Sequence, residues 1–200
     1  MRYSFFIAAL LFVFVPVFLN AGNADTLTDT NAQRLQLQKT GMITLGAWAV
    51  GNIAMGGIGM SQASGSRYHF HQMNLFWNVV NLGIAAGGYY GAASASPSGV
   101  TALHTLNEFH AFNKILLLNA GLDVAYMVGG LYLKERAKTA TKRKNMLQGF
   151  GSSVIIQGGF LLAFDLVMYG MMNSKMNNFL ESSGLTITAS GGTVGLVYSF

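Results

Sequence analysis

The sequence predicts an all-α membrane protein, a four-helix transmembrane bundle followed by a short C-terminal extracytoplasmic β-hairpin. Three observations predict this fold class. The composition is 52% hydrophobic and 10% charged, whereas an ordinary soluble domain has roughly 25% charged residues. Four apolar segments are each long enough to cross a bilayer. The last residues, GLTITASGGTVGLVYSF, alternate polar and apolar side chains around two glycines.

The N-terminus, residues 1–24, has the layout of a secretory signal peptide. One Arg precedes an apolar run over residues 5–19, and the small residues Gly22 and Ala24 then mark a cleavage site. The run is shorter than the ~20 residues of a spanning helix, and Pro16 breaks its end. We therefore predict a cleaved signal peptide, with an uncleaved N-terminal anchor as the alternative.

The rest of the chain divides into a polar arm, a membrane domain and a tail. Residues 25–40 are polar and predict an extracytoplasmic arm at the membrane surface. A four-helix transmembrane domain over residues 41–172 follows, with spans at 41–60, 72–93, 114–133 and 146–172. The links SQASGSRYHFH and KERAKTATKRKN are short enough to make two helical hairpins.

Basic residues are concentrated in these two links and predict the orientation. Arg67 lies in the first link, and the second holds or adjoins Lys134, Arg136, Lys138, Lys142, Arg143 and Lys144. Residues 94–112 contain no Lys or Arg, so the positive-inside rule places both links in the cytoplasm and both chain termini outside. The second cluster also predicts contact with anionic lipid headgroups. Nucleic-acid binding is not expected, because the cluster lacks aromatic residues and a nucleic-acid-binding fold.

The tail, residues 173–200, contains the predicted β-hairpin. Leu185 and Ile187 alternate with threonines, Gly191-Gly192 offers a two-residue turn, and apolar residues alternate again up to Phe200. A terminal Phe in such a pattern also suggests the closing strand of an outer-membrane barrel. A barrel needs many alternating segments, so we predict the bacterial inner membrane and keep the outer membrane as the alternative.

The second span carries an unusual row of polar side chains. His71, Asn74, Asn78 and Asn81 fall within an arc of about 80° on a helix, and Gly83, Gly87 and Gly91 lie on nearly the opposite side. Amides in lipid need interhelical hydrogen bonds, and glycine rows let helix backbones approach closely. We expect this helix to be buried between neighbours. The alternative is that the amides line a path for a solute.

The third and fourth spans carry further intramembrane groups. The polar ones are Asn119, Asp123, Gln157 and Asp165, and a second small-residue row consists of Gly121, Ala125 and Gly129. An intramembrane acid is a candidate functional residue because it is costly to keep there. Asp123 lies near the middle of its span and Asp165 nearer the outer end, so we expect Asp123 to matter more. If its role is structural, we expect it to be neutral and bonded to Asn78 or Asn119.

The sequence predicts no metal, no cofactor and no enzyme. His69 and His71 lie at the predicted inner face and His104 and His110 in the outer loop, so the four histidines cannot share one ion. His104, Glu108 and His110 have the spacing of a weak surface metal site, but a second pair of ligands is missing. The chain has no Cys, and no nucleophile is paired with a positioned base.

Two apolar motifs, FHQMNLFWNVVNLGIAAGGYYG and FGSSVIIQGGFLLAFD, resemble small uncharacterised multipass proteins of Bacteroidota-type bacteria. The resemblance implies a bacterial membrane setting and no particular activity. We predict a nonenzymatic accessory or scaffold protein that contacts membrane lipids and either self-associates or docks against another membrane protein. The alternative is a small transporter or channel whose path uses Asn78, Asn81, Asn119 and Asp123.

Overall fold

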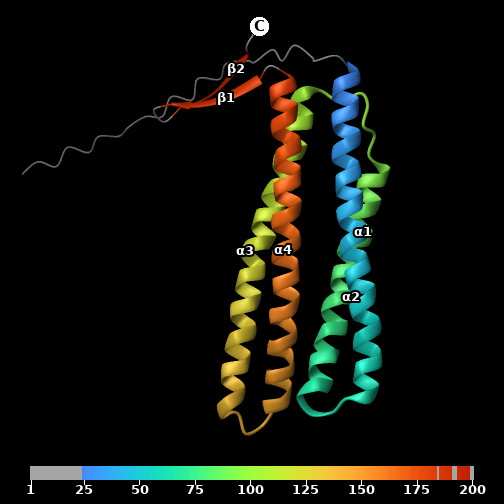
Figure 1. The fold of residues 1–200 in the computed structure, drawn as a ribbon, viewed down its shortest axis with the longest axis vertical. Helices are drawn as coiled ribbons and strands as arrows, with labels where there is room; N and C mark the ends of the chain where they lie inside the picture. The colour runs from blue at the N-terminus through green and yellow to red at the C-terminus, as the bar shows by residue number, and fades with distance from the viewer. Residues whose placement is uncertain (1–23, 184, 191–192, 199–200) are drawn as a thin grey trace, which may run out of the picture.

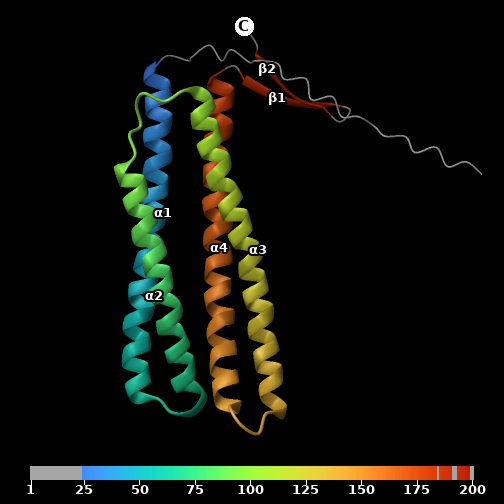
Figure 2. The same cartoon turned by 180° about the vertical axis from the view of Figure 1, so that it is seen from behind.

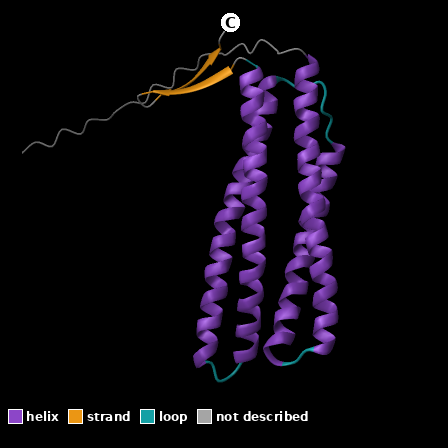
Figure 3. Ribbon diagram, in the orientation of Figure 1, coloured by secondary structure: helices purple, strands orange, loops and turns teal. Residues whose placement is uncertain are grey.

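The computed structural model describes residues 24–183, 185–190 and 193–198. These residues form four long α-helices and two short strands (Figures 1 and 3). The helices are α1 (Ala24–Gln62), α2 (Gly65–Ser94), α3 (Ala102–Thr139) and α4 (Lys144–Ser182), and the strands are β1 (Leu185–Ser190) and β2 (Thr193–Tyr198). Most of the predicted signal peptide, residues 1–23, lies outside the described residues.

The helices form two antiparallel hairpins, α1–α2 and α3–α4, which lie side by side (Figures 1 and 2). The hairpins pack together mainly through α2 and α4. No Cα atom of α2 lies within 8 Å of a Cα atom of α3, although both helices are fully described. We call the end where residues 63–64 and 140–143 link the helices the basic end. The end with the loop over residues 95–101 is the core end.

Three of the helices are much longer than the predicted spans. At 1.5 Å per residue, the 39 residues of α1 extend about 58 Å, whereas a bilayer core is ~30 Å thick. The predicted arm over residues 25–40 is the first part of α1 and not a separate segment. It continues the helix because Leu27, Leu35 and Leu37 form an apolar face that is buried against the rest of the bundle.

The core end is packed like a soluble helical bundle. Its apolar cluster joins α1, α3 and α4 through Leu37, Leu106, Phe109, Leu116, Met168, Met172, Met176 and Leu180. Beside it, Arg34 Nη1 donates to Glu108 Oε2 at 3.2 Å, and Asn31 Nδ2 donates to Thr105 Oγ1 at 2.8 Å. These polar contacts fasten the first part of α1 to the beginning of α3.

Toward the basic end the arrangement of side chains is the opposite of that at the core end: polar side chains are buried and apolar ones are exposed. The buried polar residues include Asn52, Asn74, Asn78, Asn81, Asp123, Ser153, Gln157 and Asp165. Large apolar side chains such as Val50, Ile58, Val79, Leu118, Val128 and Val167 are exposed. A soluble protein shows the opposite preference, whereas exposed apolar side chains are favourable in lipid.

Among the described residues, three helices are long and apolar enough to cross a membrane, with candidate spans at Thr26–Gln62, Ala102–Thr139 and Lys144–Ser182. The sequence had predicted four spans. Helix α2 is not among the three. It nevertheless runs alongside α1 through the same part of the bundle (Figure 2).

Close helix packing uses other glycines than the two rows noted in the sequence. A Cβ atom added to Gly130 of α3 would lie 2.7 Å from the carbonyl oxygen of Gly151 of α4, so the two backbones are in contact there. By contrast, a Cβ atom added to any glycine of the two rows (Gly83, Gly87, Gly91, Gly121 and Gly129) would meet nothing within 4 Å among the described residues. Ala125 is likewise exposed. The two rows are therefore exposed and do not pack against each other, although Gly91 lines a cavity together with Arg34 of α1 and Phe112 of α3.

After α4 the chain forms the antiparallel pair β1–β2. The register runs from Leu185 opposite Tyr198 to Ser190 opposite Thr193. The Gly191-Gly192 turn and Phe200 lie outside the described residues.

Candidate functional site

A hydrogen-bonded network of side chains crosses the bundle interior and joins α1, α2 and α4. The Trp48 indole Nε1 donates to Gln157 Oε1 at 3.0 Å, and Gln157 Nε2 donates to Asn74 Oδ1. Asn74 Nδ2 in turn donates to Asn52 Oδ1 at 2.9 Å. Each of these bonds joins two helices, so the network holds the hairpins together where apolar packing alone would give no preference between protein and lipid.

The rest of the amide row continues this network along α2. Asn78 Nδ2 donates to the Asn74 carbonyl at 2.8 Å, and Asn81 Nδ2 donates to Asn78 Oδ1 at 3.4 Å. His71 is half-buried and its ring packs over Gly59 of α1. The asparagine side chains of the row are buried, and their contacts agree with the packing interpretation.

The two intramembrane acids lie together. Asp123 on α3 and Asp165 on α4 line the same cavity, and the residues are 3% and 5% exposed. Gly158 is the α4 residue that lies against the Asp123 backbone, so Asp165 is two helical turns, about 10 Å, further along α4.

The side-chain directions on the two antiparallel helices shorten the distance between the two carboxyl groups. A Cα–Cβ bond tilts toward the N-terminus of its own helix. The Asp123 side chain therefore leans toward the core end and that of Asp165 toward the basic end, so the two side chains lean toward each other. Asp165 thus lies nearer the core end than Asp123, as its sequence position indicates, but both acids line one cavity and are not separate sites; their relative importance stays a prediction.

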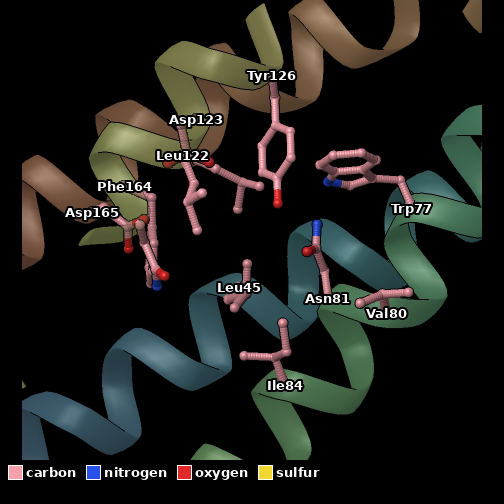
Figure 4. Close-up of a pocket in the computed structure, with 12 residues that line it drawn as sticks. Leu45, Trp77, Val80, Asn81, Ile84, Leu122, Asp123, Tyr126, Phe164 and Asp165 are labelled. Atoms are coloured by element: carbon pink, nitrogen blue, oxygen red, sulfur yellow. The ribbon is translucent and has the colours of Figure 1, made fainter. Parts of the chain in front are cut away.

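Beside the acid pair lies a cavity of about 320 Å³ to which all four helices contribute (Figure 4). It is lined by Leu45, Trp77, Val80, Asn81, Ile84, Asn119, Leu122, Asp123, Tyr126, Leu161, Phe164 and Asp165. The cavity exists because the backbones of α2 and α3 do not approach each other. The rings of Trp77 and Tyr126 bridge this gap edge to face, with their centroids 4.8 Å apart.

The carboxyl pair has unused hydrogen-bonding capacity. Two neighbouring carboxyl groups in an apolar surrounding do not both ionise readily, because their like charges repel each other. Asp123 Oδ2 is buried and has no hydrogen-bond partner among the described residues. The expected hydrogen bonds from Asn78 or Asn119 to Asp123 are not formed in the described part of the chain: Asn78 bonds to Asn74, and Asn119 lines the cavity.

The basic cluster lies exposed at the basic end. The side chains of Lys134, Arg136, Lys138, Lys142, Arg143 and Lys144 are all exposed, and Lys138 pairs with Glu135 at 2.6 Å. A second cavity of about 420 Å³ lies here between His69 and the first residues of α4. Headgroup binding by this cluster stays a prediction.

The weak metal site of the sequence is not assembled. The Glu108 carboxylate is paired with Arg34. Within the residues that the structure describes, no three His, Asp or Glu side chains are grouped so that they could hold a metal ion.

Residues 44–166 match the sequence pattern of DUF6992, described as a family of unknown function. The chain belongs to the DUF6992 family. The family segment begins within α1 and ends directly after Asp165, so it contains the interhelical network and both aspartates. It excludes Arg34 and the β-hairpin. No curated protein and no solved structure matches the chain.

Sequence reasoning missed three residues of this DUF6992 chain's interior: Trp48, Asn52 and Trp77. Asn52 carried a usable signal, because it is the only amide within the apolar segment at 41–60. Trp48 lies one turn before it on the same helix face. Trp77 has no comparable signal, since an indole in a membrane helix faces lipid as readily as it faces a neighbour.

Proposed function

We propose that this protein is a nonenzymatic accessory or scaffold protein of a bacterial inner membrane. The observation that supports the proposal most is that the buried helix faces carry hydrogen-bonded amides, whereas exposed faces carry rows of small residues. Asn74, Asn78, Asn81 and Gln157 are engaged in hydrogen bonds inside the bundle, whereas the small-residue rows are exposed, with open space beside each glycine. The exposed rows offer a surface on which another transmembrane helix can approach closely.

Orientation in the membrane follows from the charges. The basic end carries the exposed Lys and Arg cluster, and the loop at the core end has no basic residue. The positive-inside rule favours a cytoplasmic basic end. The overlong core end then extends on the outer side, together with the β-hairpin, whose free strand edge suits strand addition by a partner.

Co-purification without crosslinker from a mild detergent tests the scaffold proposal. We expect a stoichiometric membrane-protein partner, or a defined homo-oligomer, that is lost on Gly87→Ile. Gly57→Ile is the matched control, because Gly57 is also an exposed helical glycine with nothing within 4 Å of an added Cβ atom. A monomer without partners, or equal loss in both variants, would count against the proposal.

A transport function is the second candidate, and the acid pair favours it. A carboxyl group that moves a proton or a cation must change its charge or partner, and none of the described residues bonds to Asp123 Oδ2 and would prevent this. If the protein transports, Asp123→Asn should fold and insert normally but abolish the growth phenotype that the intact gene supports. If the role is structural, the same variant should retain both stability and phenotype.

A further inference from the structure

The cavity between the two hairpins has chemistry that a scaffold does not need. Its volume of about 320 Å³ is at the lower end of the range for small-ligand sites, roughly 300–1,000 Å³. Most of its wall is aliphatic or aromatic, including Leu45, Ile84 and Phe164. Polar groups converge on it from α2, α3 and α4, the pattern expected for a site that orients a mainly apolar ligand.

The carboxyl pair sets the charge of the ligand. Asp123 and Asp165 line the same cavity, and with one proton between them the pair places one negative charge beside apolar walls. Among the described residues no Lys or Arg lines this cavity. An anion would be repelled here, and a neutral apolar molecule would leave the charge and Asp123 Oδ2 unpaired, at the cost of desolvation without compensation.

The other polar and aromatic groups indicate an organic cation and not a bare metal ion. The described residues offer two carboxyl groups and no third acidic or histidine ligand at this place. Asn81 and Asn119 supply further amide oxygens. Figure 4 shows Tyr126 extending from α3 toward Asn81, with Trp77 beside it. Aromatic rings attract organic cations through their electron-rich faces.

The entrance faces the side of the molecule. Val80 and Ile84 of α2 are 62% and 56% exposed although they line the cavity. Leu122 and Tyr126 form the opposite edge on α3 and are also exposed. The gap between α2 and α3 therefore opens where the other apolar side chains of the bundle face lipid.

We propose that this cavity binds a small organic monocation, a protonated primary or secondary amine with an apolar body, which enters from the lipid between α2 and α3. The ammonium N–H groups donate to the carboxyl oxygens of Asp123 and Asp165. The apolar body lies against the aliphatic wall. This binding does not rest on the scaffold function, because it is argued from the cavity and its two carboxyl groups.

The test uses the full chain in nanodiscs of zwitterionic phosphatidylcholine. Benzylamine, 2-phenylethylamine and hexylamine are compared by calorimetry and by thermal unfolding with benzyl alcohol, 2-phenylethanol and hexanol. Each alcohol matches its amine in shape and differs in charge, so it also controls for partition into the bilayer. We expect at least one amine to bind at least tenfold more tightly than its alcohol.

Three variants locate the binding. Asp123→Asn and Asp165→Asn should each weaken amine binding at least tenfold, whereas Glu181→Gln, which removes an exposed carboxylate outside the cavity, should not. Val80→Phe narrows the entrance at an exposed position without removing charge, and should weaken binding even if the aspartate variants do not fold.

Several results would overturn the proposal. These are equal binding of amines and alcohols, no binding of any of the three amines, and wild-type affinity in Val80→Phe together with a folded Asp123→Asn. A stabilisation by NaCl alone that equals the effect of the amine would assign the site to an inorganic cation instead. None of these results changes the co-purification expected of a scaffold, so the two proposals fail separately.

Discussion

Replacing Gln157 by Leu tests whether the interhelical network holds the two hairpins together. Gln157 accepts a hydrogen bond from the Trp48 indole and donates one to Asn74 Oδ1, so the change removes two bonds between helices. Interhelical hydrogen bonds in membrane proteins contribute about 0.6 kcal/mol on average and up to ~1.7 kcal/mol. The expected loss in the free energy of unfolding is therefore about 1–3 kcal/mol. It should lie toward the upper value because Asn74 is only 2% exposed and keeps an unpaired acceptor.

Reversible unfolding in mixed micelles, followed by tryptophan fluorescence, measures this loss. Gln148→Leu is the matched control, because Gln148 is an exposed residue of the same helix and its replacement should leave stability within about 0.5 kcal/mol. A double-mutant cycle with Trp48→Phe should give a coupling energy of at least ~0.5 kcal/mol, as expected for residues in direct contact. Equal stability of Gln157→Leu and Gln148→Leu, or strict additivity in the cycle, would refute the reasoning.

Three further predictions follow from the packing, the acid pair and the charges. Gly130→Val should destabilise the protein by about 1–3 kcal/mol because the added side chain pushes α3 away from α4. Gly129→Val has open space beside it and should cost only the lower helix propensity of Val, well under about 1 kcal/mol. Thermal unfolding of the two variants measures the difference. Asp165→Asn should shift the melting temperature as much as Asp123→Asn does, since the two acids line the same cavity; a clearly smaller effect at Asp165 would restore the interpretation as separate acids. A protease site inserted at Thr139 should resist protease added to intact spheroplasts and should be cut once the spheroplasts are lysed. Cleavage in intact spheroplasts, from the periplasmic side, would show that the orientation is the reverse of the predicted one.

Hydropathy and period were sufficient to predict four helices and the burial of the asparagine row, but not the length of the helices. Lipid leaves the chain few options, because the backbone must be hydrogen-bonded within each spanning element. The extent of α1 was nevertheless available in the sequence, because Leu27, Asn31 and Leu35 recur at helical spacing and are buried in the structure. The polar residues on the exposed face of residues 25–40 made the segment look like a surface arm and concealed this helical spacing.

The acid pair and the glycine contacts could not be predicted in the same way. The levels of Asp123 and Asp165 were compared by sequence position, which ignores the opposite tilt of side chains on antiparallel helices. Gly83 and Gly130 are both glycines of membrane helices, yet only Gly130 lies at a contact. Which glycine lies there depends on the relative rotation of two helices, and this is decided by tertiary contacts such as the network at Gln157.

The length of α1, α3 and α4 has a mechanical consequence. About half of each helix, some 28 Å, is more than the bilayer core needs, and no break separates the part in lipid from the part beyond it. The three helices therefore form one rigid unit that continues from the membrane-spanning part to the core end. A tilt of the helices caused by a molecule wedged between α2 and α3 would displace the core end of this unit by several ångströms. A protein bound at the core end would register the displacement without contacting the membrane.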